Sequence, residues 1–220
     1  MRLDTYVKLT DRTFQQIQEF GFHLQDEPTQ TIWFKNTLIC LLMALLREYQ
    51  SLTVGLKKST PLLTWACRNM LELNIYTKYA LRSGSNAKDS ADDMWIDAID
   101  IFSSFRAWLK FHDPSAVTPE LDQTIANFQS EKTKHGVARK TYLKVSEMAV
   151  AVDFSDEYRH MNKVTSKLVH PTAYSVLAHS DQGELENLKP IFFHAGVRYG
   201  LEAFNYIREY IRENRVEPLP

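Results

Sequence analysis

Two sets of polar residues in this sequence lie within apolar, helix-like stretches and are of types that can do chemistry. Arg68 and Glu72 stand four residues apart, so they share one face of a helix. A charged pair in apolar surroundings is costly unless its partners are fixed. The pair is therefore either an internal ion pair that locks helix packing or part of a site that faces a ligand. The apolar neighbours that we expect to be buried are Trp65, Leu71, Ile75 and Tyr79.

A second set follows four-residue steps from Tyr158 toward a helix end. Asn162, Ser166 and His170 drift by only about 40° per step, so they form a polar edge on one helix. Pro171 ends that helix, because the residue before a proline avoids the helical conformation. The helix macrodipole favours a protonated His170, which suits a general acid or a phosphate-binding group. The alternative is that His170 only bonds the carbonyl groups at the helix end.

These two sets are expected to meet in the fold. An uncompensated buried charge is strongly destabilising, so further polar groups should converge on Arg68 and Glu72. The polar edge that ends at His170 contains the most suitable groups. Antiparallel helices in a bundle would bring this edge against the face that carries Arg68 and Glu72. We therefore predict one polar site in which Arg68 approaches His170.

A third set is basic. Several cations within a short stretch, with Tyr142 among them, could contact the phosphate groups of RNA or DNA. The alternative is a solvated surface, because only one aromatic residue is interleaved and the rest of the chain is not basic. The candidate nucleic-acid-binding residues are Lys132, Lys134, Arg139, Lys140 and Lys144.

The acidic motifs do not predict a metal site. Glu157 and His160 have the spacing of a carboxylate-bridged di-iron helix, but the chain has no second Glu-x-x-His pair to complete it. Asp92, Asp93 and Asp97 are interpreted as a solvated acidic face of a helix. We therefore expect neither a metal ion nor a cofactor.

The elements that must position these residues are helices. The chain of 220 residues has only 7 Gly and 8 Pro, fewer than a many-stranded protein needs for its turns. Apolar residues recur along it at helical spacing. We predict an all-α, single-domain bundle of about six to eight helices over residues 1–220, with 113–152 as a peripheral or inserted section. The central helices are expected at 30–55, 60–82, 88–112, 155–170 and 190–215, with 174–188 as a loop.

The overall charge excludes a strong general field that would attract anionic partners. Lys and Arg number 26 against 27 Asp and Glu, which leaves a formal net charge of -1. The most apolar run, 37–46, is shorter than the roughly 20 residues of a membrane span, so we expect a core helix and no membrane partner. Cys40 and Cys67 are predicted to be buried thiols in a cytoplasmic protein.

The order of these motifs resembles a known superfamily. An Arg-x-x-x-Glu helix, a variable insert, a helix end of the form Ser166-x-x-x-His170-Pro171 and a final amphipathic helix are similar to bacterial helical bundles of the HEPN superfamily. The resemblance implies a HEPN-like core, a dimer, and metal-independent RNase activity in toxin–antitoxin or antiviral defence systems. The signature of that activity is an arginine with a polar residue directly after it and a histidine a few residues further on.

The residues of this chain leave two functions open. Arg68 and Asn69 begin such a signature, but no histidine follows at the required spacing. Arg106 and His112 have the spacing and form a separate candidate pair, although alanine follows this arginine. One possible function is a bacterial defence or toxin-type effector that acts on RNA or a nucleotide. The other is a non-catalytic helical module that binds a cognate protein partner or a second copy of itself.

Overall fold

The computed structural model of this chain is an all-α single body, with no strand among the residues that it describes. The predicted fold class is thus confirmed. The described residues are 3–26, 32–139, 141–170 and 182–213. They form the helices α1 (Leu3–Asp26), α2 (Ile32–Lys58), α3 (Thr60–Ala80), α4 (Gly84–His112), α5 (Pro119–Lys134), α6 (Val145–Ala151), α7 (Ser155–Val169) and α9 (Gln182–Glu213).

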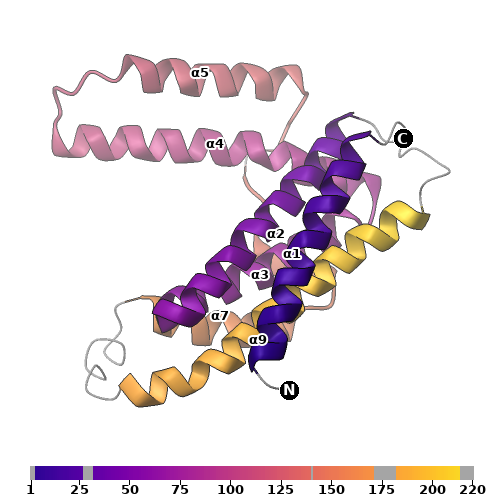
Figure 1. Ribbon diagram of the computed structural model, residues 1–220. Coiled ribbons are helices and arrows are strands. Elements are labelled where there is room, and N and C mark those ends of the chain that lie inside the picture. Colours follow the sequence, from indigo (N-terminus) through magenta and orange to yellow (C-terminus); the bar gives the residue numbers. More distant parts are fainter. Residues whose placement is uncertain (1–2, 27–31, 140, 171–181, 214–220) are drawn as a thin grey trace.

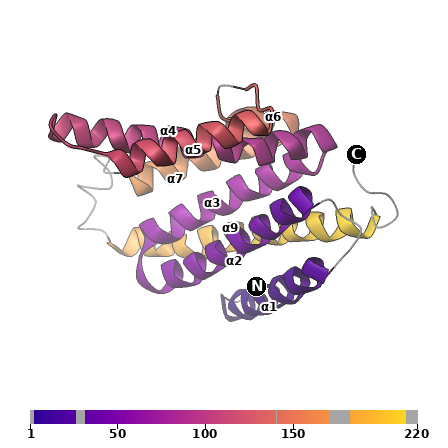
Figure 2. The ribbon, with the colours of Figure 1, turned by 90° about the horizontal axis from the view of Figure 1, so that it is seen from above.

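Helix α3 lies at the centre of the bundle. It packs mainly against α9 and α2, with further contacts to α7, α4 and α6 (Figures 1 and 2). Ser59 caps its first turn by accepting a hydrogen bond from the Leu62 N–H, and Pro61 occupies an early position that needs no N–H donor. Several neighbouring helices therefore fix where each side chain of α3 lies. Its fully buried residues include Leu63, Ala66, Cys67, Met70 and Leu71.

Helix α2 is the apolar core helix that the sequence predicts. The Tyr49 hydroxyl, which is buried, donates a hydrogen bond to the Val197 carbonyl of α9 and so ties the two helices together. By length and composition alone, the segment Phe34–Lys58 would also be long and apolar enough to cross a membrane. Half of its most apolar stretch is buried inside the protein, which is the usual state of a core helix in a bundle.

Helices α4 and α5 form a hairpin that projects from one side of the bundle as an arm (Figure 1). Helix α5 packs mainly against α4. In this contact, the Phe128 ring of α5 lies 5.6 Å from Phe102 and 6.1 Å from Trp95 between ring centroids. The arm therefore includes the second half of α4 as well as part of the section that we expected to be peripheral. The buried residues of α4 all belong to its first half and are Ala87, Ser90, Asp93 and Ile96.

The last helix begins earlier than predicted. Helix α9 starts at Gln182, so the final part of the expected loop is helical, and Pro190 lies inside the helix instead of opening it. A proline there removes one backbone hydrogen bond. The helix continues through it because Phe192 and Phe193, directly after the proline, are buried in the core. Residues 174–181 of the predicted loop lie outside the described residues.

Three further predictions about local structure are corrected. Cys40 and Trp65 are exposed, whereas we expected both to be buried. Each lies on the side of its helix opposite the residues that enter the core, because helical geometry leaves one side of even a very apolar helix facing outward. Helix α4 begins at Gly84, inside the predicted turn, because Ser83 caps it by accepting a hydrogen bond from the Asn86 N–H.

Candidate functional site

Arg68 joins α3 to α7. Its Nε donates to Glu72 Oε1 at 2.9 Å, and its Nη1 donates to Ser166 Oγ at 3.4 Å. Both side chains of the ion pair are 27% exposed, so the pair lies at the edge of the core and can be reached by solvent. The structure thus brings three of the predicted site residues together, from two helices that are far apart in the sequence.

Tyr158 and Asn162 lie on the same edge of α7, two turns and one turn before Ser166. Burial raises the pKa of Tyr158, the charge of Glu72 raises it further, and Arg68 lowers it. The charges of the ion pair therefore act on the Tyr158 hydroxyl. Asn162 Oδ1 is buried, and no donor among the described residues bonds it. We call Arg68, Glu72, Tyr158, Asn162 and Ser166 the α3–α7 polar cluster.

His170 lies at the end of the same helix, four residues beyond Ser166. It is exposed, its backbone is extended, and its backbone N–H donates to the Ser166 carbonyl at 3.1 Å. It therefore caps α7 at the rim of the α3–α7 polar cluster. The closeness of the His170 ring to the Arg68 guanidinium stays a prediction.

Arg106 and His112, the separate candidate pair, lie on the arm. Arg106 Nη1 donates to Asp122 Oδ1 of α5 at 2.6 Å. The His112 ring lies edge-on to Trp108, with the ring centroids 4.8 Å apart. Six residues along a helix turn a side chain by about 240°, so the two candidates point to different sides of α4. Arg106 and His112 consequently contact different residues.

Most of the basic candidates that the structure describes are held in ion pairs. Arg139 donates to Asp93 Oδ1 at 2.7 Å, which fastens the chain before α6 to α4. Lys134 and Lys144 pair with glutamates three residues away in the chain. Lys140 lies outside the described residues. A role for this stretch in binding nucleic acid stays a prediction.

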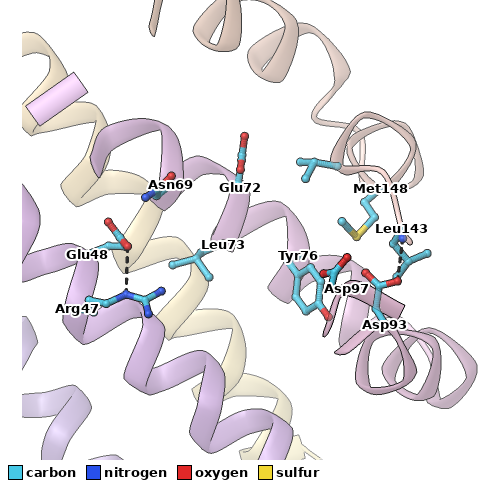
Figure 3. Close-up of a pocket in the computed structure, with 11 residues that line it drawn as sticks. Arg47, Glu48, Asn69, Glu72, Leu73, Tyr76, Asp93, Asp97, Leu143 and Met148 are labelled. Atoms are coloured by element: carbon cyan, nitrogen blue, oxygen red, sulfur yellow. Dashed lines mark hydrogen bonds and ion pairs between the residues drawn. The ribbon is translucent and has the colours of Figure 1, made fainter. Parts of the chain in front are cut away.

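A cavity of about 360 Å³ lies between α2, α3, α4 and the chain around α6 (Figure 3). In Figure 3, Arg47 and Asn69 lie with a glutamate of α2 toward one end, whereas Tyr76 lies with aspartates of α4 toward the other. Glu72 lines the cavity and also belongs to the α3–α7 polar cluster. The carboxylates of the lining are Glu48, Glu72, Asp93 and Asp97.

The carboxylates give the α4 end of this cavity a negative potential. Burial raises the pKa of Asp97, the charges of Asp93 and Asp100 raise it further, and the charge of Arg139 lowers it in part. Burial raises the pKa of Tyr76 to about 12, with further contributions in the same direction from Asp93 and Asp97. The Tyr76 hydroxyl donates to the Ser90 carbonyl at 2.7 Å, which holds the ring in the cavity wall. A positively charged group would therefore be favoured here.

A polar network that joins α3, α7 and α9 was not found by sequence reasoning. Glu157 accepts hydrogen bonds from Arg198 Nη2, at 2.5 Å, and from the Tyr199 hydroxyl. Asn74 Nδ2 donates to Glu202 Oε2 at 3.0 Å. The sequence suggested only a metal-ligand role for Glu157, because its partners come from a helix distant in the chain. In the described part of the chain, no three or more His, Cys, Asp or Glu residues are grouped so that they could hold a metal ion.

An apolar surface on the arm was also missed. Five residues of α4 alternate at steps of four and three, and we call them the outer seam. Ile101 is 62% exposed and Trp108 is 54% exposed. The rings of Phe105 and Trp108 stack with centroids 5.8 Å apart. The regular spacing of the five residues was the sequence signal that could have revealed the outer seam. The outer seam consists of Met94, Ala98, Ile101, Phe105 and Trp108.

Comparisons with known proteins leave the fold without a family. No family model matches the chain, and neither the curated proteins nor the solved structures give a match. The chain is therefore described as an all-helical protein of eight described helices, and the HEPN resemblance rests on the sequence motifs alone.

Proposed function

We propose that this protein is a helical interaction module that associates with a second copy of itself through the outer seam of α4. The observation that carries the proposal is a row of large apolar side chains, Ile101, Phe105 and Trp108, exposed on a projecting arm. Monomeric proteins rarely expose a contiguous apolar surface of this kind unless it binds something. Aromatic residues in particular supply much of the binding energy of protein interfaces.

The spacing of the outer seam specifies the kind of surface that would cover it. Steps of four and three residues repeat every seven residues, which is the pattern of a helix that packs against another helix in a coiled coil. On a different side of α4, Trp95 and Phe102 already pack against α5. A further helix on the outer seam would complete a small helical bundle around α4.

The charges of α4 favour a second copy in antiparallel orientation. Asp97 and Asp100 precede the middle of the outer seam in the sequence of α4, whereas Arg106, Lys110 and His112 follow it. Antiparallel pairing would place the acidic half of one α4 next to the basic half of the other. Parallel pairing would instead bring like charges together, which is unfavourable.

Sedimentation velocity over a concentration series tests this association. The wild-type chain is expected to form dimers, and the double variant Ile101→Lys, Trp108→Glu should weaken the association by roughly tenfold or more. Ile191→Lys on α9 is the matched control, because Ile191 is 61% exposed but lies away from the arm. The proposal is wrong if the wild-type chain stays monomeric, or if the double variant associates as strongly as the control.

Charge exchange tests the antiparallel orientation separately. Ser104→Glu should weaken the dimer, because position 104 is exposed, borders the outer seam and would face Asp97 of the partner's α4 in an antiparallel pair. Adding Asp97→Lys to the same chain should restore the association in an antiparallel pair. If the second substitution gives no recovery, the antiparallel orientation is excluded.

The contact between Arg68 and Ser166 favours a second candidate function. We infer that the α3–α7 polar cluster, with His170 at its rim, acts on RNA or a nucleotide in a bacterial defence or toxin-type effector. His170→Ala should then abolish RNA cleavage or growth inhibition while the circular dichroism spectrum is unchanged. His160→Ala, on an exposed position of the same helix, is the control. An inactive wild-type chain, or full activity of the His170 variant, would remove this candidate.

A further inference from the structure

We propose that the cavity between α2, α3, α4 and α6 binds a linear aliphatic diamine or polyamine. None of the five residues of the outer seam lines the cavity, so this inference does not depend on the association proposed above. It rests on a buried carboxylate with an unused oxygen, on a second acidic end, and on an apolar wall between them.

Glu48 is the first of these features. Its side chain is only 6% exposed, and it lines the cavity. Glu48 Oε1 accepts a hydrogen bond from Arg47 Nε at 3.4 Å, but no described residue donates to Glu48 Oε2. A buried carboxylate oxygen without a donor is costly, and an ammonium group supplies both the charge and the hydrogen bond that it lacks. Arg47 cannot fill this role fully, because its side chain is 73% exposed and reaches only Oε1.

The second feature is the acidic group at the opposite end. Asp93 already accepts bonds from Arg139 and from the Leu143 N–H. Asp97 is exposed at the cavity and lies in the repulsive field of Asp93 and Asp100. A second ammonium group beside Asp97 would relieve that repulsion. The cavity therefore offers one carboxylate for a cation at each end (Figure 3).

The length and the wall of the cavity select a linear chain. Asn69 and Tyr76, which mark the two ends on α3, are seven residues apart, or about 10 Å along the helix axis. Leu73, Leu143 and Met148 line the cavity and offer apolar contacts to methylene groups. The volume of about 360 Å³ is within the range of small-molecule sites. Carboxylates placed so far apart do not converge on one point, as a divalent metal ion requires.

Isothermal titration calorimetry at physiological salt tests the proposal with defined probes. The wild-type chain should bind 1,6-diaminohexane and spermidine, and it should not bind 1,6-hexanediol, which has the same chain length without charge. Glu48→Gln should lower the affinity for the diamine by roughly tenfold or more, because the charge-assisted bond is lost. Glu19→Gln, on an exposed position of α1, is the control and should leave the affinity unchanged.

A second variant separates two-ended binding from a general effect on folding. Asp97 is exposed, so Asp97→Asn should fold normally. It should weaken binding of 1,6-diaminohexane but not of 1-aminohexane, which has an ammonium group only for Glu48. The proposal is overturned if the wild-type chain shows no heat of binding, if the diol binds as well as the diamine, or if Glu48→Gln and Asp97→Asn both bind the diamine like the control.

Discussion

At the scale of single residues, the two cysteines show how the side of a helix decides the chemistry of a side chain. Cys67 is fully buried, and burial raises the pKa of its thiol to about 12. Cys40 lies on the exposed side of α2. Because the thiolate is the nucleophilic form, a buried thiol with a high pKa is inert. The two residues are therefore chemically different, although both lie in apolar stretches of the sequence.

We predict that iodoacetamide modifies Cys40 but not Cys67 in the native protein at mildly alkaline pH. After denaturation both thiols should react, because the burial that protects Cys67 is lost. Peptide mass spectrometry measures the extent of modification at each site. A Cys40→Ser variant should take up no label in the native state. Equal labelling of both cysteines before denaturation would contradict the prediction.

The ion pair of Arg68 and Glu72 should stabilise the fold, and the contribution of each residue to the free energy of unfolding should depend on the other. We expect Arg68→Ala to lower the free energy of unfolding by about 1–2 kcal/mol, because it leaves a half-buried carboxylate unpaired and removes the contact to Ser166. Glu72→Ala in the same background should then cost little more. A double-mutant cycle by urea denaturation measures this coupling.

The matched control for this cycle is the surface pair of Arg159 and Asp156. Its side chains are 69% and 85% exposed. Solvent screens such a pair, so its coupling energy should be below about 0.5 kcal/mol. If the Arg68 and Glu72 pair couples no more strongly than this control, its proposed contribution to stability is wrong.

At the scale of elements, glycine allows α2 and α3 to meet closely at their connection. A Cβ atom on Gly55 would lie 2.5 Å from the backbone nitrogen of Leu63 and 2.6 Å from its Cα. No side chain can move aside there, because the obstructing atoms belong to the backbone. We expect Gly55→Ala to lower the free energy of unfolding by about 1–3 kcal/mol.

Gly21 provides the opposite case on α1. The nearest atom to a Cβ there would be Leu42 Cδ1 at 3.9 Å, which is an ordinary contact. Gly21→Ala should therefore raise the free energy of unfolding by about 0.5–1 kcal/mol, since alanine is the better helix former. Urea denaturation followed by circular dichroism compares the two variants. Equal effects of both substitutions would show that the close approach at Gly55 is unimportant.

The elements were largely predictable because their signals are local. Ser59 and Pro61 mark the start of α3 in the sequence, and the structure places a capped helix start there. Pro190 was misread for a physical reason: a proline signals the start of a helix only when nothing else stabilises the turn before it. Exposure along α4 was less predictable, because it depends on where α5 lies. Trp95 packs on α5, whereas Phe105 lies on a side of α4 that α5 does not cover and is exposed.

The candidate site was less predictable than the helices. Arg68 and Ser166 could be anticipated as neighbours, because a charge in an apolar helix requires a polar partner. The cavity could not be anticipated, since Glu48 becomes distinctive only when the packing of α2 and α3 removes it from water. Asp97 reaches the opposite end of the same cavity from another helix. Which residues from different helices line one cavity depends on how the helices are arranged in space, and local sequence patterns do not predict that arrangement.

At the scale of the whole molecule, the acidic end of the cavity should affect how the free energy of unfolding depends on pH. Burial and repulsion raise the pKa of Asp97 above its ordinary value of 3.8. In the window just above that value, the folded protein holds more protons than the unfolded chain, so this group lowers stability as the pH rises. Asp97→Asn should therefore gain stability over the wild type as the pH rises through this window, by less than about 0.5 kcal/mol at neutral pH.

Asp122 is the control of opposite sign. Its hydrogen bond from Arg106 lowers the pKa of the carboxyl below 3.8, so the stability that it contributes is present above that value. This stability is lost as the pH falls through the lowered pKa of the folded protein. Asp122→Asn should consequently be less stable than the wild type at neutral pH, with the difference vanishing in acid. Thermal unfolding of the three proteins across the acidic range measures both trends, and trends of the same sign would contradict the assignment.

The projecting arm also determines what a pair of molecules would look like in solution. The second half of α4 extends roughly 20 Å, and two arms joined in opposite directions would hold the two bundles at the ends of a shared rod. Small-angle X-ray scattering from such a particle gives a distance distribution with two maxima, one from distances within a bundle and one from distances between bundles. A pair that associates through the bundles themselves would give a single maximum. The shape of the scattering curve would thus report which surface holds the two molecules together.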